Sequence, residues 1–135
     1  MSVVVDASAV VAGLLDDGTV GRWVRAASSR DDVVAPHLMP FEATDIPRRA
    51  IARGDVSDDI GCLAHRDLLD LPVILVDYPA LATRAWELRG AVSVYDAASV
   101  ALAEAYGVPL MTLDLRLAAA NGPRCRILTP PDDAD

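Results

Sequence analysis

Four acidic residues are the side chains of this 135-residue sequence best placed to do chemistry. Asp6 directly follows the apolar run 3–5, and Asp114 ends a second apolar run. Glu42 and Asp96 fall in the first turns of two expected helices. Carboxylates that meet repel one another, and protonation or a bound cation must relieve that repulsion. Because no His or Cys accompanies them, the set favours Mg²⁺ or Mn²⁺. Such a metal orients water for in-line attack, so the chemistry predicted is hydrolysis of a phosphodiester bond without a covalent intermediate.

Predicted strands and helices alternate along the chain and bring these acids to one place. Apolar, β-branched runs predict strands at residues 2–5, 32–35, 73–76, 109–113 and 126–128. Helical spacing of apolar residues predicts helices at residues 8–15, 20–27, 38–53, 57–69, 77–86 and 94–106, with a short one after Asp114. This order is typical of an α/β fold, here a three-layer α/β/α sandwich with a mostly parallel central sheet. Sites in such sheets form outside the carboxyl ends of the strands, where Asp6 and Asp114 lie.

Some local features of these elements are predicted in more detail. We expect Ser8 to cap the first helix, Ser93 to cap the helix 94–106, and Asp77 to cap the helix that follows it. Pro47 is expected to kink or break the helix in which it lies. The strand at residues 73–76 is expected to be buried.

Composition limits the kind of protein that this chain can be. The net charge is −8, and all twelve basic residues are Arg, which argues against a tight non-specific nucleic-acid binder. It does not exclude a nuclease, because cations recruited by carboxylates offset the repulsion. The length predicts one domain over residues 1–129 and a disordered tail over residues 130–135. Cys62 and Cys125 lack metal-site spacing and are expected to be reduced thiols. No signal peptide or membrane span is predicted, so we expect a cytoplasmic protein.

Four short motifs resemble those of PIN-domain nucleases. They contain, in turn, Asp6, Glu42, Asp96 and Asp114. The motifs are residues 3–11 (VVVDASAVV), 42–49 (EATDIPRR), 93–104 (SVYDAASVALAE) and 110–117 (LMTLDLRL). They occur in the family's order over the whole chain, and the length is similar to that of the VapC-type toxins of bacterial toxin–antitoxin pairs.

The resemblance implies a Mg²⁺- or Mn²⁺-dependent endoribonuclease. Asp6 and Asp96 would be the principal metal ligands, and Glu42 and Asp114 would complete the acidic site. Ser8 would hold the first acid or a metal-bound water. Family members usually form homodimers and are silenced by a small antitoxin protein that wraps the toxin. The resemblance therefore predicts an RNA substrate, an antitoxin partner and a homodimer. No association with membranes is expected, because the sequence predicts no membrane span.

Two residues depart from the pattern that this family usually shows. Asp45 stands where many relatives carry Asn, so either the site is more acidic than usual or Asp45 joins it. Pro47 interrupts a helix that is commonly continuous, which affects where Arg48 and Arg49 lie. These two arginines, with Arg116 after the fourth acid, are candidates for holding RNA phosphates. A solvated helix face is the competing interpretation of the arginines.

Other residues that could act on RNA are interpreted as structural. Tyr95 and Trp23 could stack on bases, but in an aromatic-poor chain they are expected to pack in the core. His37 and His65 are expected at the surface or in loops. Glu104 lies about 80° around its helix from Asp96 and is expected to be a solvated charge.

Four other functions compete with the ribonuclease interpretation. A receiver-type signalling domain relies on a Lys, which this chain lacks. A haloacid-dehalogenase-type phosphatase needs a second Asp two residues after the first, where Ser8 stands. The extra helices with which flap nucleases grip DNA would not fit in this length. A PIN-like binding or regulatory protein with weak or lost nuclease activity stays open, although retention of all four acids counts against it.

Overall fold

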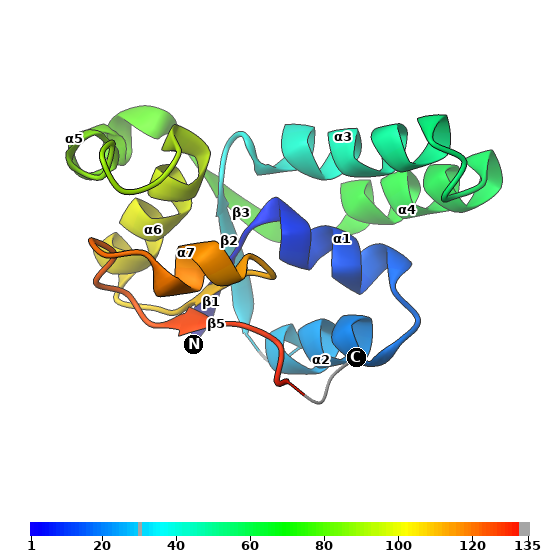
Figure 1. Ribbon diagram of the computed structural model, residues 1–135, viewed down its shortest axis with the longest axis horizontal. Helices are drawn as coiled ribbons and strands as arrows, with labels where there is room; N and C mark the ends of the chain where they lie inside the picture. The colour runs from blue at the N-terminus through cyan, green and yellow to red at the C-terminus, as the bar shows by residue number, and fades with distance from the viewer. Residues whose placement is uncertain (30, 133–135) are drawn as a thin grey trace.

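A parallel β-sheet lies between two groups of helices in the computed structural model, which describes residues 1–29 and 31–132 (Figure 1). The strands are β1 (Ser2–Val5), β2 (Asp32–Pro36), β3 (Val73–Val76), β4 (Leu110–Met111) and β5 (Ile127–Leu128). The helices are α1 (Ala7–Leu15), α2 (Thr19–Ser28), α3 (Met39–Ala52), α4 (Asp58–Asp70), the 3₁₀ turn η1 (Tyr78–Ala80), α5 (Ala82–Glu87), α6 (Val94–Tyr106) and α7 (Leu115–Ala119). Every neighbouring pair in the order β3-β2-β1-β4-β5 is parallel, which confirms the predicted α/β fold.

Alternating side chains along β1 connect the sheet to both layers of helices. Val3 and Val5 pack on one face with residues of α1 to α4, whereas Val4 packs on the other face with residues of α5 to α7. In Figure 1 the first group of helices lies to the right of the strands and the second to the left. Because helices cover both faces, a central strand such as β1 is apolar at every buried position.

The strand order places a crevice at the carboxyl ends of β1 and β4. The chain moves outward from β1 to β2 and β3, and then returns to the opposite side of β1 as β4. Val5 therefore pairs with Met111, and the Asp6 N–H donates to the Met111 carbonyl at 3.2 Å. At such a switch point the connections diverge to opposite faces of the sheet, which leaves room for a ligand.

The caps of the helices differ from expectation at two places. Ser93 Oγ accepts the N–H of Asp96 at 3.2 Å, as predicted. The N-cap of α1 is Asp6 and not Ser8, because the chain stays extended through Asp6 as it leaves β1. The Asp77 side chain makes no capping hydrogen bond. The expected helix 77–86 is divided into η1 and α5, with the buried Leu81 at the junction.

Pro47 does not break α3, which runs without interruption from Met39 to Ala52. Its ring removes one hydrogen-bond donor from the helix. Pro47 is nevertheless buried, together with Ala43 of α3 and Ala64 and Leu68 of α4. We attribute the continuity of the helix to this packing, which the local sequence does not reveal.

Two predicted strands also differ from expectation. β3 has the predicted bounds but is not buried, since Ile74 is 53% exposed and Leu75 41% exposed at the edge of the sheet. The predicted strand 109–113 is shorter, because β4 ends at Met111 and the chain turns there toward α7.

The predicted disordered tail at residues 130–135 is described only in part. Residues 130–132 have no helix or strand, and residues 133–135 of the expected disordered tail lie outside the described residues. The division into a domain over residues 1–129 and a tail therefore stays a prediction. No helix in the described part of the chain is long and apolar enough to span a membrane.

Candidate active site

One groove at the carboxyl ends of β1 and β4 brings the four predicted acids together. It has a volume of about 570 Å³ and is bordered by the starts of α1, α3 and α6. Its lining includes the carboxylates Asp6, Glu42, Asp45, Asp96 and Asp114, together with Ser8, Arg49, Tyr95 and Ser99. We call this the acid groove. Residues more than a hundred positions apart in the sequence thus form one surface.

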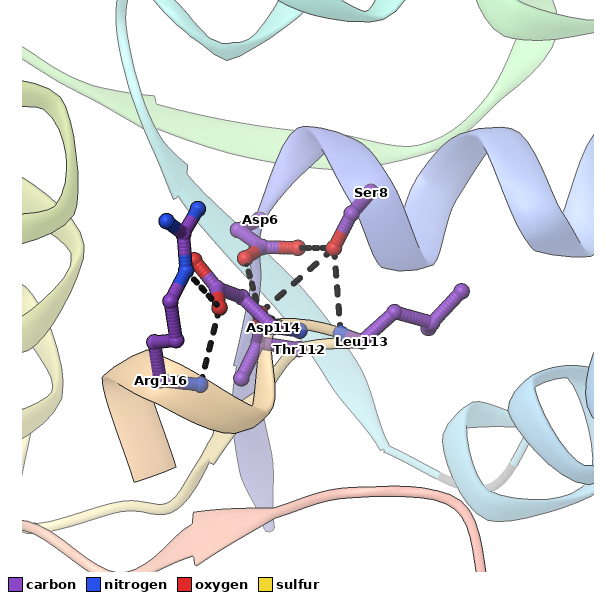
Figure 2. A network of polar contacts seen from close by, with 6 residues as sticks. All are labelled: Asp6, Ser8, Thr112, Leu113, Asp114 and Arg116. Atoms are coloured by element: carbon purple, nitrogen blue, oxygen red, sulfur yellow. Dashed lines mark hydrogen bonds and ion pairs between the residues drawn. The ribbon is translucent and has the colours of Figure 1, made fainter. Parts of the chain in front are cut away.

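Asp6 is the most constrained of these acids. Ser8 Oγ donates to its Oδ1 at 2.6 Å, and the N–H of Ala9 donates to the same oxygen at 3.0 Å. The hydroxyl of Thr112 donates to Oδ2. Figure 2 shows the two hydroxyls on either side of the carboxylate. Three donors therefore hold the plane of the Asp6 carboxylate before any ligand binds.

The same two hydroxyls connect Asp6 to the segment that carries Asp114. Ser8 Oγ accepts the N–H of Leu113 at 3.0 Å, and Thr112 Oγ1 accepts the N–H of Asp114 at 3.0 Å (Figure 2). Each hydroxyl has one proton, and both protons point to Asp6. The 3.5 Å approach between Ser8 Oγ and Thr112 Oγ1 is therefore not a further hydrogen bond. The network fixes the end of β4 relative to the end of β1.

Asp114 caps α7 and lies beside Arg116. Its Oδ1 accepts the N–H of Arg116 at 2.9 Å, while the Arg116 guanidinium Nε is 3.7 Å away. The Arg116 side chain is 96% exposed, so it is free to turn toward a ligand in the groove.

Glu42 and Asp96 both line the acid groove, and both lie in an environment that is unfavourable for a negative charge. Burial raises the pKa of Glu42, and the negative charges of Asp96 and Asp6 raise it further. Burial likewise raises the pKa of Asp96, followed by the charges of Asp6 and Asp114. The groove therefore concentrates negative charge that a cation or protons would stabilise.

Helix geometry partly offsets this charge. Asp6 caps α1, Glu42 lies in the first turn of α3, and Asp96 lies in the first turn of α6. The N-terminus of a helix carries a partial positive charge that favours nearby anions. Three helix starts directed at one groove explain how these carboxylates can lie together in the folded chain.

Comparison with known families identifies this arrangement. The family model of the PIN domain matches residues 3–123. This chain belongs to the PIN-domain family. Ribonuclease VapC1 of Mycobacterium tuberculosis is 40% identical to this PIN domain over 129 residues, which cover 92% of this chain and 94% of the relative.

Solved structures show the same fold. The crystal structure of PAE2754 from Pyrobaculum aerophilum is 23% identical, covers 94% of this PIN domain and 83% of its own chain, and has a TM-score of 0.69. The structure of VapBC2 from Rickettsia felis bound to a DNA fragment from their promoter contains a chain that is 10% identical, with a TM-score of 0.68. That match covers 96% of this chain and 98% of the other.

The carboxylates that line the acid groove of this PIN domain are oxygen donors of the kind that a hard divalent cation prefers. Within residues 1–29 and 31–132, no three His, Cys, Asp or Glu side chains stand close enough together to hold a metal ion. Mg²⁺ usually keeps several waters and is bound through one or two carboxylates, so it does not need a closed cage. Asp6 and Asp96, whose charges interact, fit that requirement.

Two of the three candidate arginines of the PIN domain, Arg48 and Arg49, lie on α3. The third is the exposed Arg116, described above. Arg49 lines the acid groove, and Arg48 lies beside it on the exposed face of α3. Both are paired with Asp45, at 2.5 Å from Oδ1 to Arg48 Nε and 3.2 Å from Oδ2 to Arg49 Nε. The hydrogen bond from Arg48 lowers the pKa of Asp45 and raises that of Arg48. Asp45 thus borders the groove as the partner of two cations.

Two of the residues interpreted as structural are placed differently from expectation. Tyr95 does not pack in the core: it is 52% exposed and lines the acid groove. Glu104 is not a solvated charge, because its side chain is 17% exposed and accepts Arg84 Nε at 2.7 Å. Trp23 packs partly buried against the core, and His37 and His65 are exposed, as expected.

Two residues near the site were not among the sequence candidates. Thr112 and Ser99 are the buried polar side chains of the described ranges, at 0% and 5% exposure. Ser99 follows Asp96 by one helical turn and lines the acid groove. The sequence feature that could have identified these two residues is a hydroxyl-bearing residue inside an otherwise apolar run, in Leu-Met-Thr-Leu and Ala-Ala-Ser-Val.

Proposed function

We propose that this protein is a Mg²⁺- or Mn²⁺-dependent endoribonuclease that hydrolyses RNA phosphodiester bonds and acts as the toxin of a toxin–antitoxin pair. The observation that carries the proposal is the convergence of Asp6, Glu42, Asp96 and Asp114 on one groove at the switch point of the sheet. The 40% identity to a protein named Ribonuclease VapC1 supports RNA as the substrate.

The residues of the groove have separable roles in the proposed reaction. Asp6 and Asp96 would hold the metal ion, with Glu42 and Asp114 completing its surroundings. When bound, the metal would activate water and stabilise charge on the phosphate. Ser8 and Thr112 orient the Asp6 carboxylate, so little reorganisation is needed before the ligand binds.

An antitoxin partner is proposed from a structural relative and from the exposed apolar residues beside the groove. The structural relative VapBC2 was solved bound to a DNA fragment from their promoter, which supports an antitoxin partner for this chain. Phe41 is 66% exposed and Leu38 42% exposed at the edge of the acid groove, so an apolar segment of such a partner could cover them and block access. A homodimer is proposed from the family resemblance, and a cytoplasmic location is proposed from the sequence.

The first experiment is cleavage of total bacterial RNA by the purified protein with Mg²⁺, with Mn²⁺ and with EDTA. The wild type should make discrete cuts that EDTA abolishes. Asp6→Asn should lower the rate roughly a hundredfold or more, because it removes a proposed metal ligand.

Asp17→Asn is the matched control for this experiment. Asp17 is exposed and does not line the groove, so the same change of charge there should leave cleavage unaltered. Absence of cleavage by folded protein with either metal would contradict the proposal and favour the binding protein with lost activity.

A further inference from the structure

The acid groove has little positive charge with which to hold an RNA backbone. Five carboxylates line it, whereas Arg49 is the one cation among its described lining residues. The chain as a whole has a net charge of −8. Proteins hold single-stranded nucleic acids chiefly through cations that replace the counterions of the phosphates. The availability of the nearby arginines therefore controls how strongly this groove can bind RNA.

Asp45 engages both arginines on this side of the groove. Its two oxygens are 2.5 Å from Arg48 Nε and 3.2 Å from Arg49 Nε, at the i,i+3 and i,i+4 positions of α3. All three side chains are well exposed, at 45% for Asp45, 66% for Arg48 and 57% for Arg49. Exposed ion pairs contribute little to stability and are exchanged easily. A phosphate can therefore compete with Asp45 for the two guanidinium groups.

We propose that Asp45 sets the affinity of the acid groove for RNA by holding Arg48 and Arg49 in internal ion pairs that an incoming phosphate must replace. The inference rests on the proposed function and names a regulating residue of that same site. After a phosphate has replaced it, Asp45 stays next to that phosphate and attracts cations from solution. Because this uptake offsets part of the cation release that drives binding, RNA binds more weakly than it would to the two arginines without Asp45. For the same reason, its affinity depends less steeply on salt concentration.

The test compares Asp45→Asn with Asp55→Asn. Asp55 is a close match: it pairs with Arg53 Nε at 3.0 Å, is 63% exposed, and does not line the groove. Both variants are made in the Asp6→Asn chain, with Mg²⁺ present, so that binding is measured without cleavage. The probe is a fluorescein-labelled oligouridylate, and its Kd is measured by fluorescence anisotropy over a series of salt concentrations.

Asp45→Asn should bind the probe several-fold tighter at low salt, by about tenfold at most, and with a steeper dependence of log Kd on log salt concentration. Asp55→Asn should resemble the parent. If the two substitutions had equal effects on Kd, the change in affinity would be explained by the change in net charge, and the inference would be overturned. Weaker binding by Asp45→Asn would overturn it as well.

A second set of variants tests whether Asp45 acts through its arginines. In the chain with Arg48→Gln and Arg49→Gln, Asp45→Asn should give only the small gain that comes from removing one negative charge, much less than in the chain with both arginines. An equal gain in the two chains would overturn the inference.

Cleavage of RNA by the protein with Asp6 intact is measured in parallel. If the protein with Asp6 intact cleaves RNA but the Asp45 and Asp55 variants bind the probe equally well, the inference is contradicted and the proposed function is not. Absence of cleavage contradicts the proposed function.

Discussion

At the scale of single residues, the hydroxyl of Thr112 determines how the site is assembled. It donates to Asp6 and accepts the N–H of Asp114, so one buried atom orients one carboxylate and fixes the segment of another. Ser8 does the same from the other side of Asp6. Side chains that orient metal ligands contribute to affinity and rate although they do not touch the metal.

Replacing Thr112 by Val should separate this role from packing, because the shape is kept and the hydroxyl is lost. Asp6 Oδ2 would lose a donor, and the Asp114 N–H would lose its acceptor. We expect the rate of RNA cleavage to fall about 10- to 100-fold and the Mg²⁺ concentration for half-maximal rate to rise. Thr112→Ser, which keeps the hydroxyl, is the control and should stay near the wild type. Equal rates for the two variants would contradict the role given to the hydroxyl.

At the scale of elements, the hairpin of α1 and α2 depends on a close approach of backbones. A Cβ added to Gly21 would lie 1.9 Å from the Asp16 carbonyl oxygen and 2.8 Å from that of Ala12. The Asp16 side chain also accepts the N–H groups of Gly18 at 2.7 Å and Gly21 at 3.0 Å. This tight turn sets the direction in which α2 packs against α1, the helix that Asp6 caps.

Gly21→Ala should therefore destabilise the protein by roughly 2–3 kcal/mol, since backbone atoms rather than a flexible side chain must move. Gly90→Ala is the control: nothing lies within 4 Å of its added Cβ, and a change within about 0.5 kcal/mol is expected. Urea unfolding followed by circular dichroism measures both. A stable Gly21→Ala variant would show that the two helices are not held this closely.

At the scale of the whole molecule, the fold gathers five carboxylates in the acid groove, with one arginine among its described lining residues. The pKa values of Glu42 and Asp96 are raised, by burial first and by neighbouring carboxylates second. A carboxyl group with a raised pKa in the folded state favours folding below its ordinary pKa. That contribution is lost as the pH rises through the folded value. The metal-free protein is therefore less stable at neutral pH than it would be without these charges.

Glu42→Gln should raise the melting temperature of the metal-free protein by a few degrees at pH 7, and by less at pH 5. Mg²⁺ should stabilise the wild type more than this variant, because a ligand stabilises the folded state more when it binds that state more tightly. Differential scanning fluorimetry with EDTA and with Mg²⁺ at both pH values makes the measurement. Glu87→Gln, at an exposed position off the groove, is the control. Identical melting of the two variants would contradict the electrostatic account of the groove.

Features that depend on neighbouring residues could be predicted from the amino-acid sequence alone. The bounds of β1 and β3, the start of α6 at its Ser93 cap and the alternation that makes a parallel sheet all follow from local pattern. The four predicted acids, which are four of the five carboxylates in the groove, could be chosen because each follows an apolar strand or begins a helix. Parallel strands bring such positions to one edge. The four motifs occur in the order that is typical of PIN domains, and the family comparison confirms that the chain belongs to that family.

Features that depend on residues far apart in the chain could not be predicted in this way and are seen only in the folded chain. Thr112 meets Asp6 across 106 positions, and Glu104 pairs with Arg84 of a different helix. The continuity of α3 through Pro47 and the exposure of β3 follow from what packs beside them. Local pattern reports the preference of a segment for helix or strand, whereas the burial and partners of a side chain depend on contacts that form only when the sheet assembles.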